Sequence, residues 1–185
     1  MKYKLMVLPL AMILSASVSQ AADYKNDALG ISCQYPEGWT TKENQMTKDP
    51  TIVAGTAITF VSPKEDSKDP FRDTVGVVVR SYASDMTLQR FSDMQIKSAQ
   101  KMKDAKVLSS EDAQVAGLPG HQIVFTAKQT LVPGKPGTEQ ALKLWKRWTV
   151  KGNKAYVVRY QATEDKYDQF YPKAEALAKS LSLSK

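Results

Sequence analysis

Apolar and polar residues alternate along much of the chain, and this two-residue period is typical of strands with one buried face. The clearest case is the stretch from 31 to 35, where Ile31, Cys33 and Tyr35 share one face. The run VGVVV within 74–80 is apolar on both faces, which predicts a strand in the centre of a sheet. Further strands are predicted at 57–62, 107–115, 121–129, 140–150 and 155–162, and loops at 40–50, 64–73 and 132–138.

Two segments show the 3.6-residue period of a helix instead. The first begins near Thr87 and ends near Lys103, with Thr87 or Asp85 as the capping residue. The second begins at about Asp165 and continues to the end of the chain. Their apolar stripes are Leu88, Phe91, Met94, Ala99 and Met102 in the first, and Tyr167, Phe170, Tyr171, Ala174, Leu177, Ala178 and Leu181 in the second.

Two turns join neighbouring strands directly. The sequence AGLPG at 116–120 predicts a turn that uses the conformational freedom of Gly117 and Gly120, and KGNK at 151–154 predicts a hairpin. Strands in hairpins with two separate helices predict an α+β fold: a mainly antiparallel sheet of six or seven strands covered by helices.

The first residues have the pattern of a secretory signal peptide. Lys2 and Lys4 precede an apolar run that is too short to span a membrane, and small residues follow at 19 and 21. We expect cleavage after Ala21, with the site after Ala22 as the next best. No cysteine follows the cut, so the mature chain carries no bacterial lipid anchor there, and no later apolar run is long enough to span a membrane. The expected location is the periplasm or the exterior.

Residues 22–185 have the usual length of one domain. Removing Lys2 and Lys4 from the 26 basic residues leaves 24 against 19 acidic ones, a net charge of +5, which favours anionic partners. The single cysteine cannot form an internal disulfide, so the core must supply the stability. Repeats and low-complexity tracts are absent from the sequence.

The reactive side chains do not form a recognisable catalytic or cofactor motif. Cys33 and His121 are the only thiol and imidazole, and both are predicted on apolar strand faces, which favours a buried thiol and a structural histidine over a catalytic dyad. The acidic residues of 64–73 lack the spacing of a calcium loop and alternate with basic ones. A zinc cluster, a nucleophile elbow and a nucleotide-binding glycine loop are also missing, so no cofactor is expected.

The most suggestive segment for binding is KLWKRW at 143–148. Basic residues interleaved with tryptophans can bind sugars, anionic lipid headgroups or single-stranded nucleic acid, and export argues against nucleic acid. Strand alternation places Trp148 in the core, leaves Trp145 as the tryptophan that can be exposed, and makes Lys146 an exception on the apolar face. The predicted binding surface consists of Lys143, Trp145, Arg147, Lys151 and Lys154.

Several short motifs occur in a characteristic order: GIS-x-x-YP-x-GW at 30–39, TL-x-x-F at 87–91, AGLPG, GNKAYVVRYQA at 152–162 and KSLSL at 179–183. This series resembles the PsbP-like family and, more loosely, the DcrB-like envelope proteins, over the whole mature chain. The resemblance implies an α-β-α sandwich. The family includes an extrinsic photosystem II subunit that helps to retain calcium and chloride, and exported bacterial proteins of unknown role, without a shared catalytic site.

Together these features predict a non-catalytic exported protein that binds an envelope component, as an accessory or assembly factor. Two alternatives stay open at this point. One is an enzyme of unfamiliar type, such as a hydrolase whose carboxylates come from distant strands. The other is a binder of anionic lipid or polysaccharide that uses the basic hairpin.

Overall fold

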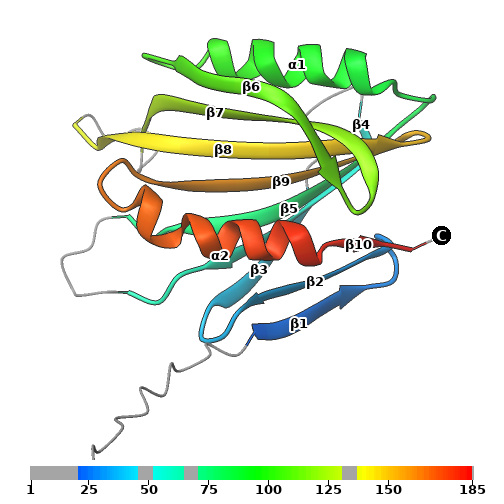
Figure 1. The fold of residues 1–185 in the computed structure, drawn as a ribbon, viewed down its shortest axis with the longest axis horizontal. Helices are drawn as coiled ribbons and strands as arrows, with labels where there is room; N and C mark the ends of the chain where they lie inside the picture. The colour runs from blue at the N-terminus through cyan, green and yellow to red at the C-terminus, as the bar shows by residue number, and fades with distance from the viewer. Residues whose placement is uncertain (1–20, 46–51, 65–70, 131–136, 185) are drawn as a thin grey trace, which may run out of the picture.

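The structure is a computed structural model that describes residues 21–45, 52–64, 71–130 and 137–184. Seven strands form one antiparallel sheet in the order β3-β4-β5-β9-β8-β7-β6 (Figure 1). The expected α+β fold with a sheet of six or seven strands is therefore confirmed. The strands are β3 (Thr40–Gln45), β4 (Ile52–Val61), β5 (Thr74–Tyr82), β6 (Lys106–Val115), β7 (Leu118–Thr130), β8 (Glu139–Lys151) and β9 (Lys154–Thr163).

A second, three-stranded sheet has the order β1-β2-β10. Its strands are β1 (Ala21–Asn26), β2 (Ile31–Pro36) and β10 (Ser182–Leu183). Only β2 was predicted from the sequence. The prediction of a loop from 40 onwards is wrong as far as 45, because β3 occupies this segment; the predicted loop positions 46–50, 65–70 and 132–136 lie outside the described residues.

The two helices cover opposite faces of the large sheet. α1 (Leu88–Gln100) packs on β6, β7 and β8, whereas α2 (Tyr167–Ser180) packs on β9 and on β2 of the small sheet. Two tryptophans of β8 show that the helices lie on opposite faces. The Trp148 ring makes a T-shaped contact with Phe91 of α1, and the Trp145 ring makes a T-shaped contact with Tyr171 of α2. We refer to the α1 face and the α2 face of the sheet. Among the described residues, no helix is long and apolar enough to cross a membrane.

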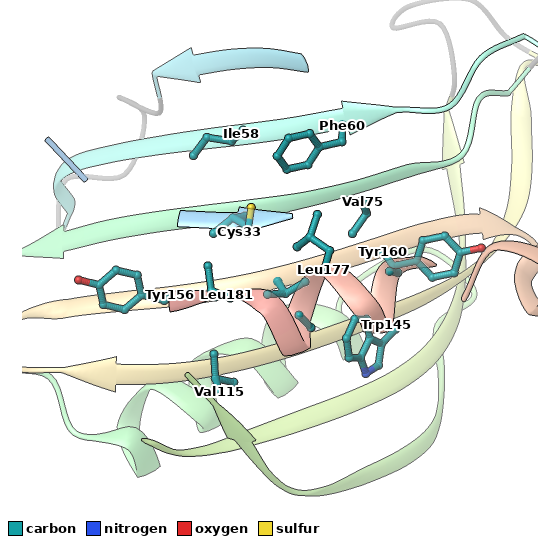
Figure 2. Packing of buried hydrophobic residues seen from close by; sticks show 14 of the residues in the cluster. Cys33, Ile58, Phe60, Val75, Val115, Trp145, Tyr156, Tyr160, Leu177 and Leu181 are labelled. Atoms are coloured by element: carbon teal, nitrogen blue, oxygen red, sulfur yellow. The ribbon is translucent and has the colours of Figure 1, made fainter. Parts of the chain in front are cut away.

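The α2 face is closed by the small sheet as well as by the helix (Figure 2). Cys33 of β2 and Leu177 of α2 belong to the same buried cluster as Phe60 and Trp145 of the large sheet. The predicted burial of Cys33 is thus confirmed. Alternation along 31–35 explains it, because Ile31, Cys33 and Tyr35 all face this layer, and the Tyr35 ring stacks on that of Phe60.

Thr87 caps α1 as the sequence predicts, since its Oγ1 accepts a hydrogen bond from the Arg90 amide at 3.2 Å. The AGLPG turn is shorter than expected. Ala116 and Gly117 alone form it, with φ values of 51° and 76°, and β7 begins at Leu118. Gly120 lies inside β7 and has a different role: a Cβ there would approach the Trp148 carbonyl oxygen to 2.3 Å.

Candidate functional site

The basic hairpin does not present an exposed tryptophan. Trp145 has 0% exposure and lies beneath α2, so the expectation that its ring is available to a ligand is wrong. Its Nε1 donates to Gln122 Oε1 at 3.2 Å, which satisfies the one polar atom of the side chain. Alternation correctly separated Trp145 from Trp148, and Trp148 is buried as predicted, but each tryptophan has a helix over it.

Lys143 and Arg147 of the predicted surface lie at the border of the α2 face. Lys143 Nζ is 4.1 Å from the centre of the Tyr167 ring and 3.5 Å from Asp168 Oδ1. The Arg147 guanidinium lies 4.8 Å from the Trp145 ring centre, and its Nε donates to Gln122. The Lys143 charge therefore contacts α2, whereas the Arg147 guanidinium is held by side chains of the sheet itself.

Lys151 and Lys154 face each other at the far end of the hairpin. Lys151 Nζ donates to the Ser184 carbonyl at 3.1 Å, beside β10. Eight positions of extended chain, about 26 Å, separate Lys143 from Lys151. The structure spreads the predicted residues along the strand and does not bring them together; binding by them stays a prediction.

A compact group of cations lies on the opposite, α1 face. Arg80 of β5, Lys146 of β8 and Arg159 of β9 form what we call the cationic cluster. Lys146 is paired directly with Arg159, and Arg159 with Gly76, in the sheet register. Because Gly76 has no side chain, the Arg159 stem can lie over it: Arg159 Nε is 3.6 Å from the place where a Cβ would stand. Arg159 Nη2 donates to Thr59 Oγ1 at 3.3 Å.

The surroundings of the cationic cluster destabilise the protonated forms of Lys146 and Arg159. Burial, followed by repulsion from Arg80 and Arg159, lowers the pKa of Lys146 to about 8. Burial of its stem against the sheet, followed by repulsion from Arg80, also lowers the pKa of Arg159. The sequence showed one sign of this group, which was the exceptional position of Lys146 on an apolar strand face.

A third group resembles the hydrogen-bond chain of a serine hydrolase. Ser110 Oγ lies 2.9 Å from His121 Nε2, and His121 Nδ1 lies 3.2 Å from Asp112 Oδ1. Ser110 and Asp112 alternate on the edge strand β6, and Asp112 is paired with His121 of β7. The Asp112 side chain is fully exposed, so water screens its charge and weakens its hold on the imidazole.

This group was missed because the turn was expected to be longer. A two-residue turn at 116–117 places 112 opposite 121, and that register follows by counting outward from the turn. From the sequence, His121 was considered only together with Cys33, and a structural histidine was favoured over a catalytic dyad. The structure keeps these two apart: Cys33 belongs to the core of the α2 face, while the His121 ring lies against Trp148 of the α1 face.

The thiol of Cys33 is a poor nucleophile in this setting. Burial raises its pKa to about 12, and the side chain is almost fully enclosed. None of three depressions on the described surface brings two carboxylates together: one beside β2 and α2 has none in its lining, and the others have only Asp23 or Asp112. Among the described residues, no group of three or more metal-ligating side chains converges.

No family model matches the chain, and no curated protein matches its sequence. Solved structures do match its fold. The cyanobacterial PsbP protein CyanoP of Synechocystis sp. PCC 6803 superimposes with a TM-score of 0.58 and 16% identity, over 95% of this chain and 99% of CyanoP. LpqN, involved in cell envelope biogenesis of Mycobacterium tuberculosis, matches with a TM-score of 0.56 and 9% identity, over 91% and 88% of the two chains. The fold is therefore PsbP-like, as the sequence resemblance implied.

Proposed function

We propose that this chain is an exported, non-catalytic protein that binds another component of the cell envelope, as an accessory or assembly factor. The observation that supports the proposal is the position of the fold relative to the predicted export signal. The first strand, β1, begins at Ala21, where the sequence predicts cleavage, and the chain from there onward has the fold of LpqN, an envelope biogenesis protein. Removing residues 1–21 leaves five of the six β1–β2 pairs in place.

The chemistry of the described side chains supports binding over catalysis. The thiol is buried, and two of the depressions each have a single carboxylate in their lining. Burial and repulsion between cations lower the pKa of Lys146 on the α1 face. These are properties of a surface that holds a partner, since catalysis needs groups converging on one reacting atom.

The test has two parts. Intact mass of the protein recovered from the envelope fraction is expected to correspond to a chain that begins at Ala22. Cross-linking in intact cells, affinity purification and mass spectrometry are then expected to identify the same envelope component repeatedly. The matched control is the chain without residues 1–21, which stays in the cytoplasm and should not capture that component. Retention of Met1 to Ala21, or equal capture by the control, would contradict the proposal.

A second candidate, ester hydrolysis, has the Ser110–His121–Asp112 geometry in its favour. In that reaction Ser110 Oγ attacks the ester carbonyl while His121 takes the hydroxyl proton and passes it to the departing alcohol; water then hydrolyses the acyl-serine. The exposed Asp112 makes this the weaker candidate.

Hydrolysis of p-nitrophenyl acetate by the mature chain tests the second candidate. A Ser110→Ala variant that loses nearly all of the activity, with Ser109→Ala unaffected, would establish it. Equal rates for the wild type and Ser110→Ala would eliminate it, and the binding proposal predicts this result.

A further inference from the structure

The cationic cluster lies on the side of the α1 face where α1 makes fewer contacts. α1 packs mainly on β6, β7 and β8, although Tyr82 at the end of β5 contacts Phe91 of α1, and Ala57, Val78 and Val157 on this side are buried. Arg80 and Lys146 are half-buried there, and Arg159 is exposed. The three cations come from three consecutive strands of the order β5-β9-β8. Lys146 and Arg159 are paired in the register, whereas Arg80 is paired with Ala155, four positions along β9 from Arg159. A ligand can approach from the exposed side of Arg159.

The cluster has no counter-charge within the described part of the chain. Other lysines of the same region form ion pairs: Lys103 with Glu139 at 2.7 Å, and Lys128 with Asp104 at 2.9 Å. Lys146 has the Phe125 ring 5.4 Å from its Nζ and Arg159 has the Thr59 hydroxyl, neither of which carries a negative charge. Cations that are partly removed from water are normally paired, because unpaired ones are costly.

Arg80 adds a donor without an acceptor. Its Nε is buried and has no hydrogen-bond partner. A buried N–H in this state costs free energy that a bound acceptor would recover. Among the described residues, the Arg80 N–H without an acceptor and the three cations without a counter-charge are independent observations. An anion with several oxygen atoms would satisfy both.

The geometry points to a binding site for a phosphate group at Arg80, Lys146 and Arg159, on the side of the α1 face where α1 makes fewer contacts. This deepens the proposed function, on which it rests, by giving the envelope component a chemical class: a phosphate ester, borne by a lipid headgroup or by a small solute. Guanidinium groups bind phosphate through paired N–H donors, and an ammonium group adds a point charge. The hydroxyl of Thr59, already bonded to Arg159, lies at the border of the site.

The site has a predictable dependence on pH. Phosphate binds the protonated form of Lys146, and the pKa of this side chain in the free protein is about 8. Affinity should therefore be constant below pH 7 apart from the titration of phosphate itself, and should fall as the pH rises through 8 and 9. The groups that face Lys146 are Arg80, Arg159 and the Phe125 ring, so no carboxylate of the described residues opposes this trend.

Titration of the purified mature chain with inorganic phosphate, at constant ionic strength, tests the site directly. We expect saturable heat of binding and a rise in Tm. Lys146→Gln and Arg159→Gln should each weaken binding at least about tenfold, as expected when a charged hydrogen bond is lost. Lys97→Gln and Lys106→Gln remove the same charge from exposed lysines elsewhere and should leave the affinity within about twofold.

The variants are also measured for folding by circular dichroism, and Lys146→Met provides a second substitution that suits the apolar surroundings. Equal affinity of the wild type, Lys146→Met and Arg159→Gln for phosphate would overturn the inference, as would equal weakening by Lys97→Gln and Lys106→Gln. Because this assay uses purified protein, a negative result leaves the export and capture experiments of the proposed function unaffected.

Vesicles distinguish the two sources of phosphate. Co-sedimentation with phosphatidylglycerol vesicles but not with phosphatidylcholine vesicles, abolished by Lys146→Gln and not by Lys97→Gln, assigns the site to a lipid headgroup. Binding of inorganic phosphate without sedimentation assigns it to a soluble phosphate ester. Sedimentation that all four variants weaken equally would show a diffuse charge effect and would contradict a defined site.

Discussion

The two faces of the seven-stranded sheet deal with polar groups in different ways. On the α2 face, a helix and a second sheet enclose large aromatic side chains whose polar atoms are uncharged hydroxyl and indole groups. Tyr160 Oη donates to the Tyr167 carbonyl, whereas the Tyr167 hydroxyl is buried without a hydrogen-bond partner among the described residues. On the α1 face, one helix covers the β6–β8 side, and three cations lie on the remainder. The comparison indicates that one face of the sheet provides stability, while the other can carry a charged ligand at a cost to stability.

The largest effect is expected from truncating the enclosed face. Trp145→Ala should lower the free energy of unfolding by about 3–5 kcal/mol, because the ring is fully buried between β8 and α2. Urea unfolding followed by circular dichroism measures this loss. A change below about 1 kcal/mol would mean that α2 does not cover the ring in solution, and the two faces would then be more alike than we describe.

An effect of opposite sign is expected on the α1 face. Lys146→Met should raise the free energy of unfolding at pH 7 by about 1–2 kcal/mol, the low end for replacing buried charges, since the side chain is only half-buried. The wild type should also gain stability relative to the variant between pH 8 and 10. In that interval folded Lys146 has lost its proton, while the unfolded lysine, with a pKa of 10.5, still holds it.

Chemical unfolding of both proteins at a series of pH values gives this difference directly. Subtracting the two free energies of unfolding cancels the contribution of tyrosine titration, which is the same in the wild type and the variant. A difference that stays constant from pH 7 to pH 10 would contradict the low pKa of Lys146, and a less stable variant would show that its charge is compensated.

The smallest effect concerns Cys33 on the enclosed face. Cys33→Ala should cost on the order of 1 kcal/mol in packing, and Cys33→Ser should cost more, because it buries an unpaired hydroxyl. With its pKa raised to about 12, the thiol should react with a disulfide reagent only when the fold opens. Rapid labelling of the native protein at pH 8 would show that the α2 face is less tightly closed.

Periodicity was sufficient for the strands and helices with one buried side. The alternation of 31–35 and the helical stripe after Thr87 both correspond to elements in the structure, because burial on one face leaves a regular pattern. β3 was missed because it lacks such a pattern. All six of its residues are exposed, so nothing in the sequence distinguishes it from a loop. The two-residue β10 is too short to show any period.

The groups of polar residues were harder to predict, because each depends on the strand register or on which helix covers that part of the sheet. Trp145 was assigned to the correct strand face, but the helix that covers it begins more than twenty residues later. Arg80, Lys146 and Arg159 come together only once the order β5-β9-β8 is known. Ser110 and Asp112 join His121 only if the turn is two residues long.

The small sheet joins the first strand pair of the described chain to its last residues, and this sets an order of events during folding. Ser182 and Leu183 of β10 pair with Ser32 and Ile31 of β2, and the Gln34 amide donates to Ser180 Oγ at 2.8 Å. A contact across about 150 residues closes a very long loop, and such contacts form late. The apolar side of β2 can contact Phe60 of β4 earlier, but it is closed only when α2 and β10 are in place, so the complete α2 face is expected to assemble late in folding.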